Sequence, residues 1–231
     1  FACIGLWGPE ALSTLSKIAD EPETLSLDCF PLTTFKEVRI QGIPVLAFRI
    51  SYVGESGWEL HFPFSYGLRL WDLLFEEGVI PVGIETYANS RRLEKSFRLQ
   101  NADLLTEYNL IEAGLSRRSV KEANFHGKNA YVKQRNLDEQ VAHLCTISMT
   151  ENTDGLGISR YPIGNCPIVD PKTNEVLIDS LGRRSFTTSI SYGPSIGKNI
   201  ALCYLPKSFA SQGNELLLEY FDEQYPIKLR Q

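Results

Sequence analysis

The stretch that most constrains the fold is residues 49–62, where two strand-like runs flank a glycine-containing turn. The runs at 49–53 and 58–62 alternate between apolar and polar side chains, and glycines begin and end the four residues between them, 54–57. A short loop bounded by glycines between β-rich runs predicts a β-hairpin. We therefore expect two antiparallel strands here, and we expect the rest of the chain to pack around them.

Alternation gives this predicted hairpin one polar face and one apolar face. If the loop closes symmetrically, Tyr52 lies opposite Glu59 and Ile50 lies opposite His61. All four side chains then share one face, because strand residues alternate between faces. Trp58 and Leu60 then point to the other face, which has the composition of a core. One side of the hairpin would present a phenol, a carboxylate and an imidazole.

The polar face has two interpretations. Antiparallel sheets often expose one face to water, and a solvated face is the usual outcome for a hairpin. A carboxylate between Trp58 and Leu60 is partly screened from water, however, and so requires a donor partner. A ligand with two adjacent N–H groups, such as a pterin or a guanidine-like ring, would satisfy Glu59 bidentately.

Length, composition and charge describe a globular chain and exclude two classes of partner. The chain has 231 residues, of which 43% are hydrophobic and 22% charged, and its net charge is −5. That length is enough for a sizeable core, and the charge offers no basic stripe for a nucleic-acid backbone. No apolar run approaches the ~18 residues of a membrane span and no signal-peptide pattern is present, so we expect no membrane partner.

The cysteines and histidines show no spacing typical of a metal site. The three histidines are isolated, and the five cysteines have no close pair and an odd count. This pattern predicts reduced thiols, a cytoplasmic location and no metal. The cysteines are Cys3, Cys29, Cys145, Cys166 and Cys203.

The patterns along the chain change in its second half. Apolar periodicity predicts helices at 10–19, 66–77, 85–95 and 127–134, and strands at 32–39 and 45–53. In the helix at 66–77, the side chains expected to face inward are Leu70, Trp71, Leu73 and Leu74. From residue 143 onward, short apolar or alternating runs are separated by Gly, Pro, Asn and Asp, as in a sandwich or barrel. These runs are 144–149, 166–169, 175–178, 185–191, 200–205 and 215–221. We predict an α+β fold with an αβ region at 1–137 and a β-barrel domain at 138–231.

The beginning of the chain predicts that it is a piece of a longer protein. Residues 1–6 read as the middle of a buried strand, and the only methionine is Met149. We therefore expect an N-terminally incomplete αβ region.

Several segments together resemble the folate-binding aminomethyltransferase family, which includes the glycine-cleavage T-protein and the C-terminal part of dimethylglycine and sarcosine dehydrogenases. Each segment alone is weakly specific, but they occur in the family's order and cover nearly the whole chain. The dehydrogenase-type branch fits best, through Trp58 and Lys95. The matching segments are 6–9, 49–60, 92–98, Asp103, 111–115, 125–128, 187–189 and 197–201.

The resemblance implies a partial cloverleaf of αβ domains with a C-terminal all-β barrel and a central hole that holds tetrahydrofolate. In that family a tyrosine and the second glutamate of a Y-x-G-E-x-G-x-E motif contact the pterin, and these positions are Tyr52 and Glu59 here. Trp58 and Arg92 complete the cofactor-binding residues expected from the resemblance.

The chain also departs from the family. The family's catalytic aspartate precedes the Gly-Pro segment, and this chain begins after that point, so no catalytic residue is assigned. A folate-contacting arginine of the T-proteins aligns with Ala88. The glycine before Asp103 is replaced by Asn101 or Ala102, and Arg230 is only a weak counterpart of a C-terminal arginine.

The function implied by the resemblance is transfer of a one-carbon unit from a methylated or aminomethylated amine to tetrahydrofolate. The expected partners are folate, an amine donor and a flavin dehydrogenase domain or subunit. The departures keep an alternative open, namely a non-catalytic folate-binding or structural domain of a larger dehydrogenase.

Overall fold

The computed structural model describes residues 1–117, 119–137 and 140–230. They form two compact units, unit 1 (Phe1–Tyr87) and unit 2 (Ala88–Gln231), and each unit has a hydrophobic core of its own. The predicted division between residues 137 and 138 meets the gap at 138–139, outside the described residues, and stays a prediction.

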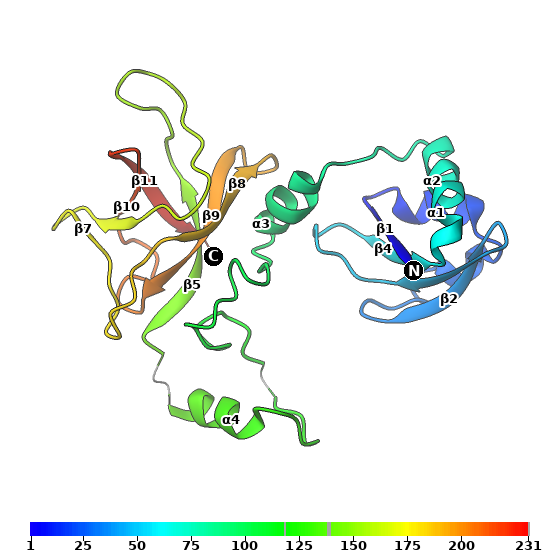
Figure 1. Ribbon diagram of the computed structural model, residues 1–231, viewed down its shortest axis with the longest axis horizontal. Helices are drawn as coiled ribbons and strands as arrows, with labels where there is room; N and C mark the ends of the chain where they lie inside the picture. The colour runs from blue at the N-terminus through cyan, green and yellow to red at the C-terminus, as the bar shows by residue number, and fades with distance from the viewer. Residues whose placement is uncertain (118, 138–139, 231) are drawn as a thin grey trace. The chain divides into compact units, whose positions relative to one another are not determined.

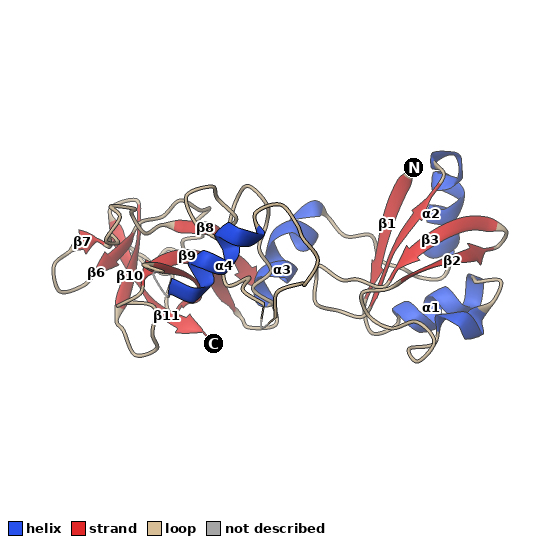
Figure 2. Ribbon diagram, turned by 90° about the horizontal axis from the view of Figure 1, so that it is seen from below, coloured by secondary structure: helices blue, strands red, loops and turns tan. Residues whose placement is uncertain are grey.

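Unit 1 is a four-stranded antiparallel sheet with two helices (Figures 1 and 2). The strands lie in the order β1-β4-β3-β2, which makes β1 an edge strand. Both helices contribute side chains to the core that β4 also enters, so they cover the same face of the sheet. The elements are β1 (Ala2–Trp7), α1 (Ala11–Ile18), η1 (Pro22–Leu25), β2 (Phe35–Ile40), β3 (Ile43–Phe48), β4 (Gly57–Phe62), η2 (Phe64–Tyr66) and α2 (Gly67–Glu76).

The two faces of β4 agree with the predicted alternation. Trp58, Leu60 and Phe62 are at most 1% exposed, whereas Glu59 and His61 on the opposite face are only partly buried. Burying a large apolar side chain contributes about 1.5–3 kcal/mol, so the apolar half of β4 fixes the orientation of its polar half.

The apolar stripe of α2 is narrower than the sequence predicted. Leu70 and Leu74 are buried, as expected for positions four residues apart on one helix face. Trp71 was also predicted to face inward, and this is wrong, because its side chain is 47% exposed. Successive helix residues are about 100° apart, which places Trp71 at the margin of the stripe.

The cross-strand pairs predicted for the hairpin are wrong, although β4 itself is correct. The antiparallel partner of Glu59 is Phe48 and that of His61 is Leu46, rather than Tyr52 and Ile50. The connection between β3 and β4 therefore comprises residues 49–56 instead of the four predicted.

The longer loop has a physical cause in contacts made by β1. The backbone carbonyl of Ile50 accepts a hydrogen bond from Trp7 Nε1 at 2.9 Å, and the carbonyl of Ser56 accepts one from the amide of Gly8 at 2.9 Å. These bonds hold both ends of the loop against β1, so residues 49–53 do not extend the β3 ladder.

Unit 2 is a seven-stranded antiparallel sheet with the order β7-β6-β10-β11-β5-β9-β8. Pro167, just before β6, bridges to Phe186, just before β8, and Thr187 donates to Cys166 O at 2.9 Å. These links join β6 to β8 and close the sheet into a barrel. The strands are β5 (Ala142–Met149), β6 (Ile168–Asp170), β7 (Glu175–Val176), β8 (Thr187–Gly193), β9 (Lys198–Pro206), β10 (Leu216–Tyr220) and β11 (Glu223–Arg230).

Two more of the predicted helices are present in the structure. The helix predicted at 85–95 is present as a continuous helical run at residues 84–94, of which η3 (Thr86–Arg91) is π-helical and α3 (Arg92–Glu94) is the last part. The helix predicted at 127–134 is present as α4 (Lys128–Leu137). Among the described residues, no helix combines the length and apolar composition that crossing a membrane requires.

A buried ion pair forms the polar centre of unit 2. Arg92 and Asp103 are both fully buried and lie 2.8 Å apart. Arg92 also donates to Ser189 Oγ and to the carbonyls of Ala88 and Phe97. A buried charge needs such partners, because losing them leaves it without either water or a counter-charge. The pair therefore ties α3 to β8.

A second polar cluster in unit 2 lies under a tyrosine pair. The rings of Tyr108 and Tyr204 stack with centroids 3.5 Å apart, and the Arg183 guanidinium lies 4.2 Å from the Tyr108 centroid. Arg183 pairs with Glu112 at 2.6 Å and with Asp179 at 2.7 Å. Burial raises the pKa of Tyr108 to about 12, against the opposing effect of the Arg183 charge.

Replacing Asp103 by Ala should lower the free energy of unfolding of unit 2 by about 3–5 kcal/mol, because Arg92 would remain buried without its counter-charge. Urea unfolding followed by far-UV circular dichroism measures this change. The surface pair between the exposed Lys17 and the partly buried Glu77 provides the control, since Glu77→Gln should change stability by at most about 1 kcal/mol. Equal effects of the two substitutions would show that the buried pair is not a stabilising centre.

Stability should also fall as the pH rises from 10 to 12, in part through Tyr108. The unfolded side chain releases its proton near its ordinary pKa of 10.0, whereas the folded one keeps it until about 12. The unfolded state therefore binds fewer protons in this window, and the free energy of unfolding decreases with pH. The slope due to Tyr108 should lie below the one-proton limit of about 1.4 kcal/mol per pH unit, because the side chain is only half-buried.

Comparing the chain with its Tyr108→Phe variant over this pH range isolates the contribution of this residue. The variant should show the shallower loss of stability, and parallel curves would contradict the assignment.

Candidate functional site

The register of β1 against β4 gathers several functional side chains on the open face of the unit 1 sheet. Cys3 lies opposite His61, and Gly5 lies opposite Glu59. Directly paired residues share a face, so the thiol, the imidazole and the carboxylate lie on the side opposite Trp58. The cluster arises from two strands that are far apart in the sequence.

Three aromatic side chains, Trp7, Tyr52 and Tyr87, form what we call the aromatic shelf. The rings of Trp7 and Tyr87 are stacked, with centroids 5.4 Å apart and an interplanar angle of 16°. Tyr52 packs against Tyr87 at 5.4 Å and 53°. The hydrogen bond from Trp7 Nε1 to the Ile50 carbonyl fixes the indole ring in this position.

The position of Trp7 depends on the glycine two residues before it. A Cβ atom built at Gly5 would lie 2.1 Å from the Trp7 ring, far inside van der Waals contact. Gly5 therefore leaves room for the indole to fold back over β1. Gly57 has a comparable role, because its φ of +153° and a Cβ only 2.0 Å from the Leu6 carbonyl exclude other residues.

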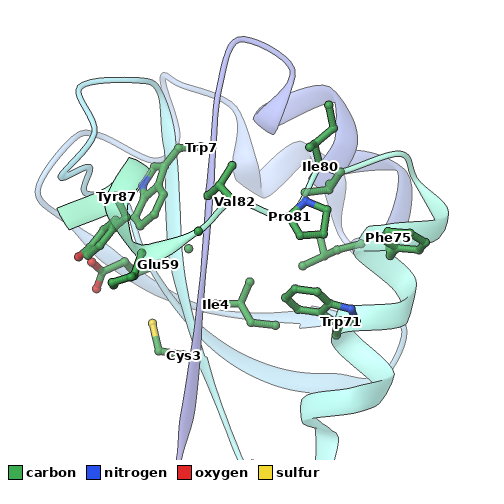
Figure 3. A pocket seen from close by; sticks show the side chains of 15 residues that line it. Cys3, Ile4, Trp7, Glu59, Trp71, Phe75, Ile80, Pro81, Val82 and Tyr87 are labelled. Atoms are coloured by element: carbon green, nitrogen blue, oxygen red, sulfur yellow. The ribbon is translucent and has the colours of Figure 1, made fainter. Parts of the chain in front are cut away.

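Glu59 and two members of the aromatic shelf, Trp7 and Tyr87, border a hollow of about 550 Å³ (Figure 3). Figure 3 shows Trp7, Tyr87 and Glu59 gathered at one end and Trp71 and Phe75 at the other. The wall between them is apolar, and the volume falls in the range of small-molecule sites. The other residues that line the hollow are Cys3, Ile4, Gly5, Leu74 and residues 79–84.

The local field at this end of the hollow is negative. The Glu59 carboxylate is 23% exposed, and its Oε2 atom lies 3.3 Å from His61 Nε2. Burial raises the pKa values of Cys3 and Tyr87, and the charge of Glu59 raises them further. The site is therefore suited to a flat ligand that donates N–H hydrogen bonds to Glu59 and stacks on an aromatic ring.

The predicted cofactor-binding residues lie in three different environments. Glu59 lines the hollow, and Tyr52 touches Tyr87, which lines it too, so Tyr87 links the two predicted residues. Trp58 belongs to the core, where its ring packs against Phe30 at 6.1 Å, and it does not line the hollow.

Arg92, the fourth predicted residue, is saturated by partners within unit 2. It is fully buried, and its guanidinium bonds to a carboxylate, a hydroxyl and backbone carbonyls. Its observed role is the ion pair with Asp103, and its binding role stays a prediction.

Sequence reasoning did not identify Trp7 or Tyr87 as site residues. Trp7 ends the first strand in the same Trp-Gly-Pro segment that contributes to the family resemblance, and this is the signal by which it was detectable. Tyr87 carries no such local signal, because its contact with the site depends on the path of residues 79–87 beside β1.

Comparisons with known proteins identify the fold and the family. A family model of the GCVT N-terminal domain matches residues 1–122, and a model of the glycine cleavage T-protein C-terminal barrel domain matches residues 165–231. Among solved structures, the glycine cleavage system aminomethyltransferase T from Bartonella henselae superposes with a TM-score of 0.77 at 20% identity. That match covers 97% of this chain and 56% of the other, and it establishes a shared fold.

Two groups of curated relatives match along nearly the entire chain. Mitochondrial dimethylglycine dehydrogenase of Homo sapiens is 33% identical over 237 residues, which is 99% of this chain and 25% of that protein. Aminomethyltransferase of Thermosynechococcus vestitus is 30% identical over 230 residues, covering 96% of this chain and 55% of that protein. The chain thus spans from a quarter to about half of the length of these relatives. Together with the two domain matches, these similarities show that the chain belongs to the glycine cleavage T-protein family.

Proposed function

We propose that this chain binds tetrahydrofolate through its pterin ring and belongs to a protein that transfers a one-carbon unit from a methylated or aminomethylated amine to that folate. The observation that carries the proposal is the position of Glu59, a carboxylate at the end of an apolar hollow beside stacked aromatic rings. Membership of the family supports the same assignment.

The chemistry of the hollow fits a pterin. A pterin ring is flat and presents an amino group next to a ring N–H, so a single carboxylate can accept both hydrogen bonds. Glu59 supplies that carboxylate, and within the described residues its ion-pair partner is His61 rather than a lysine or arginine. The rings of Trp7 and Tyr87 offer a stacking surface beside it.

Each group has a separate role in the proposed reaction. Tetrahydrofolate supplies the nitrogen that takes up the one-carbon unit. Glu59 orients the ring that carries this nitrogen, and the apolar wall around Ile4 and Leu74 excludes water from it. Fixed orientation and exclusion of water are two main sources of rate enhancement in transfer reactions.

Replacing Glu59 by Gln should weaken tetrahydrofolate binding by about 10- to 100-fold. The substitution keeps the size of the side chain but replaces a charge-assisted pair of hydrogen bonds, which is worth about 1.5–3 kcal/mol. Isothermal titration calorimetry with the 231-residue chain measures the change.

Glu37→Gln is the matched control, because Glu37 is an exposed carboxylate on β2 of the same sheet and lies outside this hollow. Its affinity should equal that of the unmodified chain. Unchanged affinity in Glu59→Gln would remove Glu59 from the site. Folate binding without release of methylene-tetrahydrofolate from an amine donor would instead favour the non-catalytic role.

Binding should also change tryptophan fluorescence through Trp7. Because Trp7 borders Glu59 and Trp71 lies at the far end of the hollow (Figure 3), a stacked pterin should quench mainly Trp7. The Trp7→Phe variant should lose most of the quench on titration with tetrahydrofolate, whereas Trp71→Phe should retain it. The opposite pattern would place the ligand at the apolar end of the hollow.

A further inference from the structure

Three side chains of different chemistry converge on the open face of the unit 1 sheet. Cys3 on β1 is the cross-strand partner of His61 on β4, and Glu59 is two residues before His61 on the same face. The potential ligand atoms of all three, one sulfur, one nitrogen and one oxygen, lie within 4.8 Å of one another.

The same atom of the imidazole faces both neighbours. Cys3 Sγ lies 3.6 Å from His61 Nε2, and Glu59 Oε2 lies 3.3 Å from that same nitrogen. A neutral ring nitrogen either carries a hydrogen or offers a lone pair, so it cannot donate to the carboxylate and accept from the thiol at once. A nucleophile activated by a histidine would place its carboxylate on the other ring nitrogen. The arrangement therefore differs from a catalytic triad.

Two of the three separations among these atoms match those between ligands of one tetrahedral metal ion. With Zn–S of about 2.3 Å and Zn–N or Zn–O of about 2.0–2.1 Å, tetrahedral angles place sulfur and nitrogen about 3.6 Å apart and nitrogen and oxygen about 3.3 Å apart. The two observed separations are 3.6 Å and 3.3 Å. Thiolate, imidazole and carboxylate together are a ligand set that zinc accepts.

We propose that Cys3, Glu59 and His61 form a binding site for a zinc-like divalent cation, with three protein ligands and one open position. A cation at the centre of the three atoms would satisfy all of them, because a deprotonated nitrogen, a thiolate and a carboxylate then each direct a lone pair at it. Spacing in the sequence does not reveal the site, since Cys3 and His61 are 58 positions apart. The pairing of β1 with β4 creates it.

Cobalt(II) is the probe for this site, because tetrahedral Co²⁺ absorbs visibly and a thiolate ligand adds a charge-transfer band. Titration of the reduced 231-residue chain with Co²⁺ should develop both features with a stoichiometry of one ion per chain, and added Zn²⁺ should abolish them. Cys3→Ser should lose the charge-transfer band. His61→Ala should bind Co²⁺ at least about tenfold more weakly, since even partners of metal ligands cost that much when removed.

Matched controls use a thiol and an imidazole outside the cluster. Cys29 and His126 are both exposed, and the Cys29→Ser and His126→Ala variants should bind Co²⁺ like the unmodified chain. The absence of a thiolate band in the unmodified chain would overturn the proposal. An identical band in Cys3→Ser, or an unchanged affinity in His61→Ala, would overturn it too.

The metal site and the proposed folate site share Glu59, and titrating the unmodified chain with each ligand separates them. Cys3→Ser should lose the thiolate band and bind Co²⁺ more weakly. Glu59→Gln should weaken both. A chain that shows the cobalt spectrum but does not bind tetrahydrofolate would support the metal site and contradict the proposed function. A chain that binds tetrahydrofolate but shows no thiolate band with Co²⁺ would support the proposed function and contradict the metal site.

Discussion

The register between β1 and β4 is the constraint on which the rest of unit 1 depends. Six consecutive pairs, from Ala2 with Phe62 to Trp7 with Gly57, define it. A shift by one residue would turn the odd-numbered side chains of β1 into the core and expel the even-numbered ones. Leu6, which is buried, would then be exposed, and Cys3 would leave the neighbourhood of His61. Packing of the core thus selects the register that also assembles the polar face.

This coupling explains how a small sheet can hold a carboxylate in a fixed position. Trp58 and Leu60 are fully buried on either side of Glu59 in the sequence, so rotation of β4 would expose two large apolar side chains. The cost of such exposure is several kcal/mol, well above the energy of a single exposed hydrogen bond. The orientation of Glu59 is therefore a consequence of the burial of Trp58 and Leu60 on the opposite face of the sheet.

Local alternation predicted what depends on local chemistry and missed what depends on distant contacts. The two faces of β4, the helices α1 and α2 and the β-rich second half all follow from periodicity in the sequence. The cross-strand partner of Glu59 does not follow from periodicity. The indole N–H of Trp7 donates to the Ile50 carbonyl, and this contact accompanies the longer loop. Tyr87 reaches the site because residues 79–87 run beside β1, and this segment has no periodic sequence pattern that predicts its path.

The barrel shows a similar limit. Sequence patterns do not predict β11, because Pro226 interrupts its run and a proline normally argues against a paired strand. In the structure the carbonyl of Pro226 accepts hydrogen bonds from both the amide and the hydroxyl of Thr150. At Pro226, which has no backbone N–H to donate, β11 is therefore still paired through the carbonyl oxygen.

The crowding at Gly5 has a consequence for how this surface tolerates mutation. Gly5 offers no functional group, yet the indole of Trp7 occupies the volume that any other residue would fill. Natural or laboratory variation at this position would disturb the neighbouring aromatic ring while leaving every polar group intact. Selection for the geometry of the site would then preserve a glycine at position 5, although this residue has no side chain to contribute. A search confined to reactive side chains would overlook it.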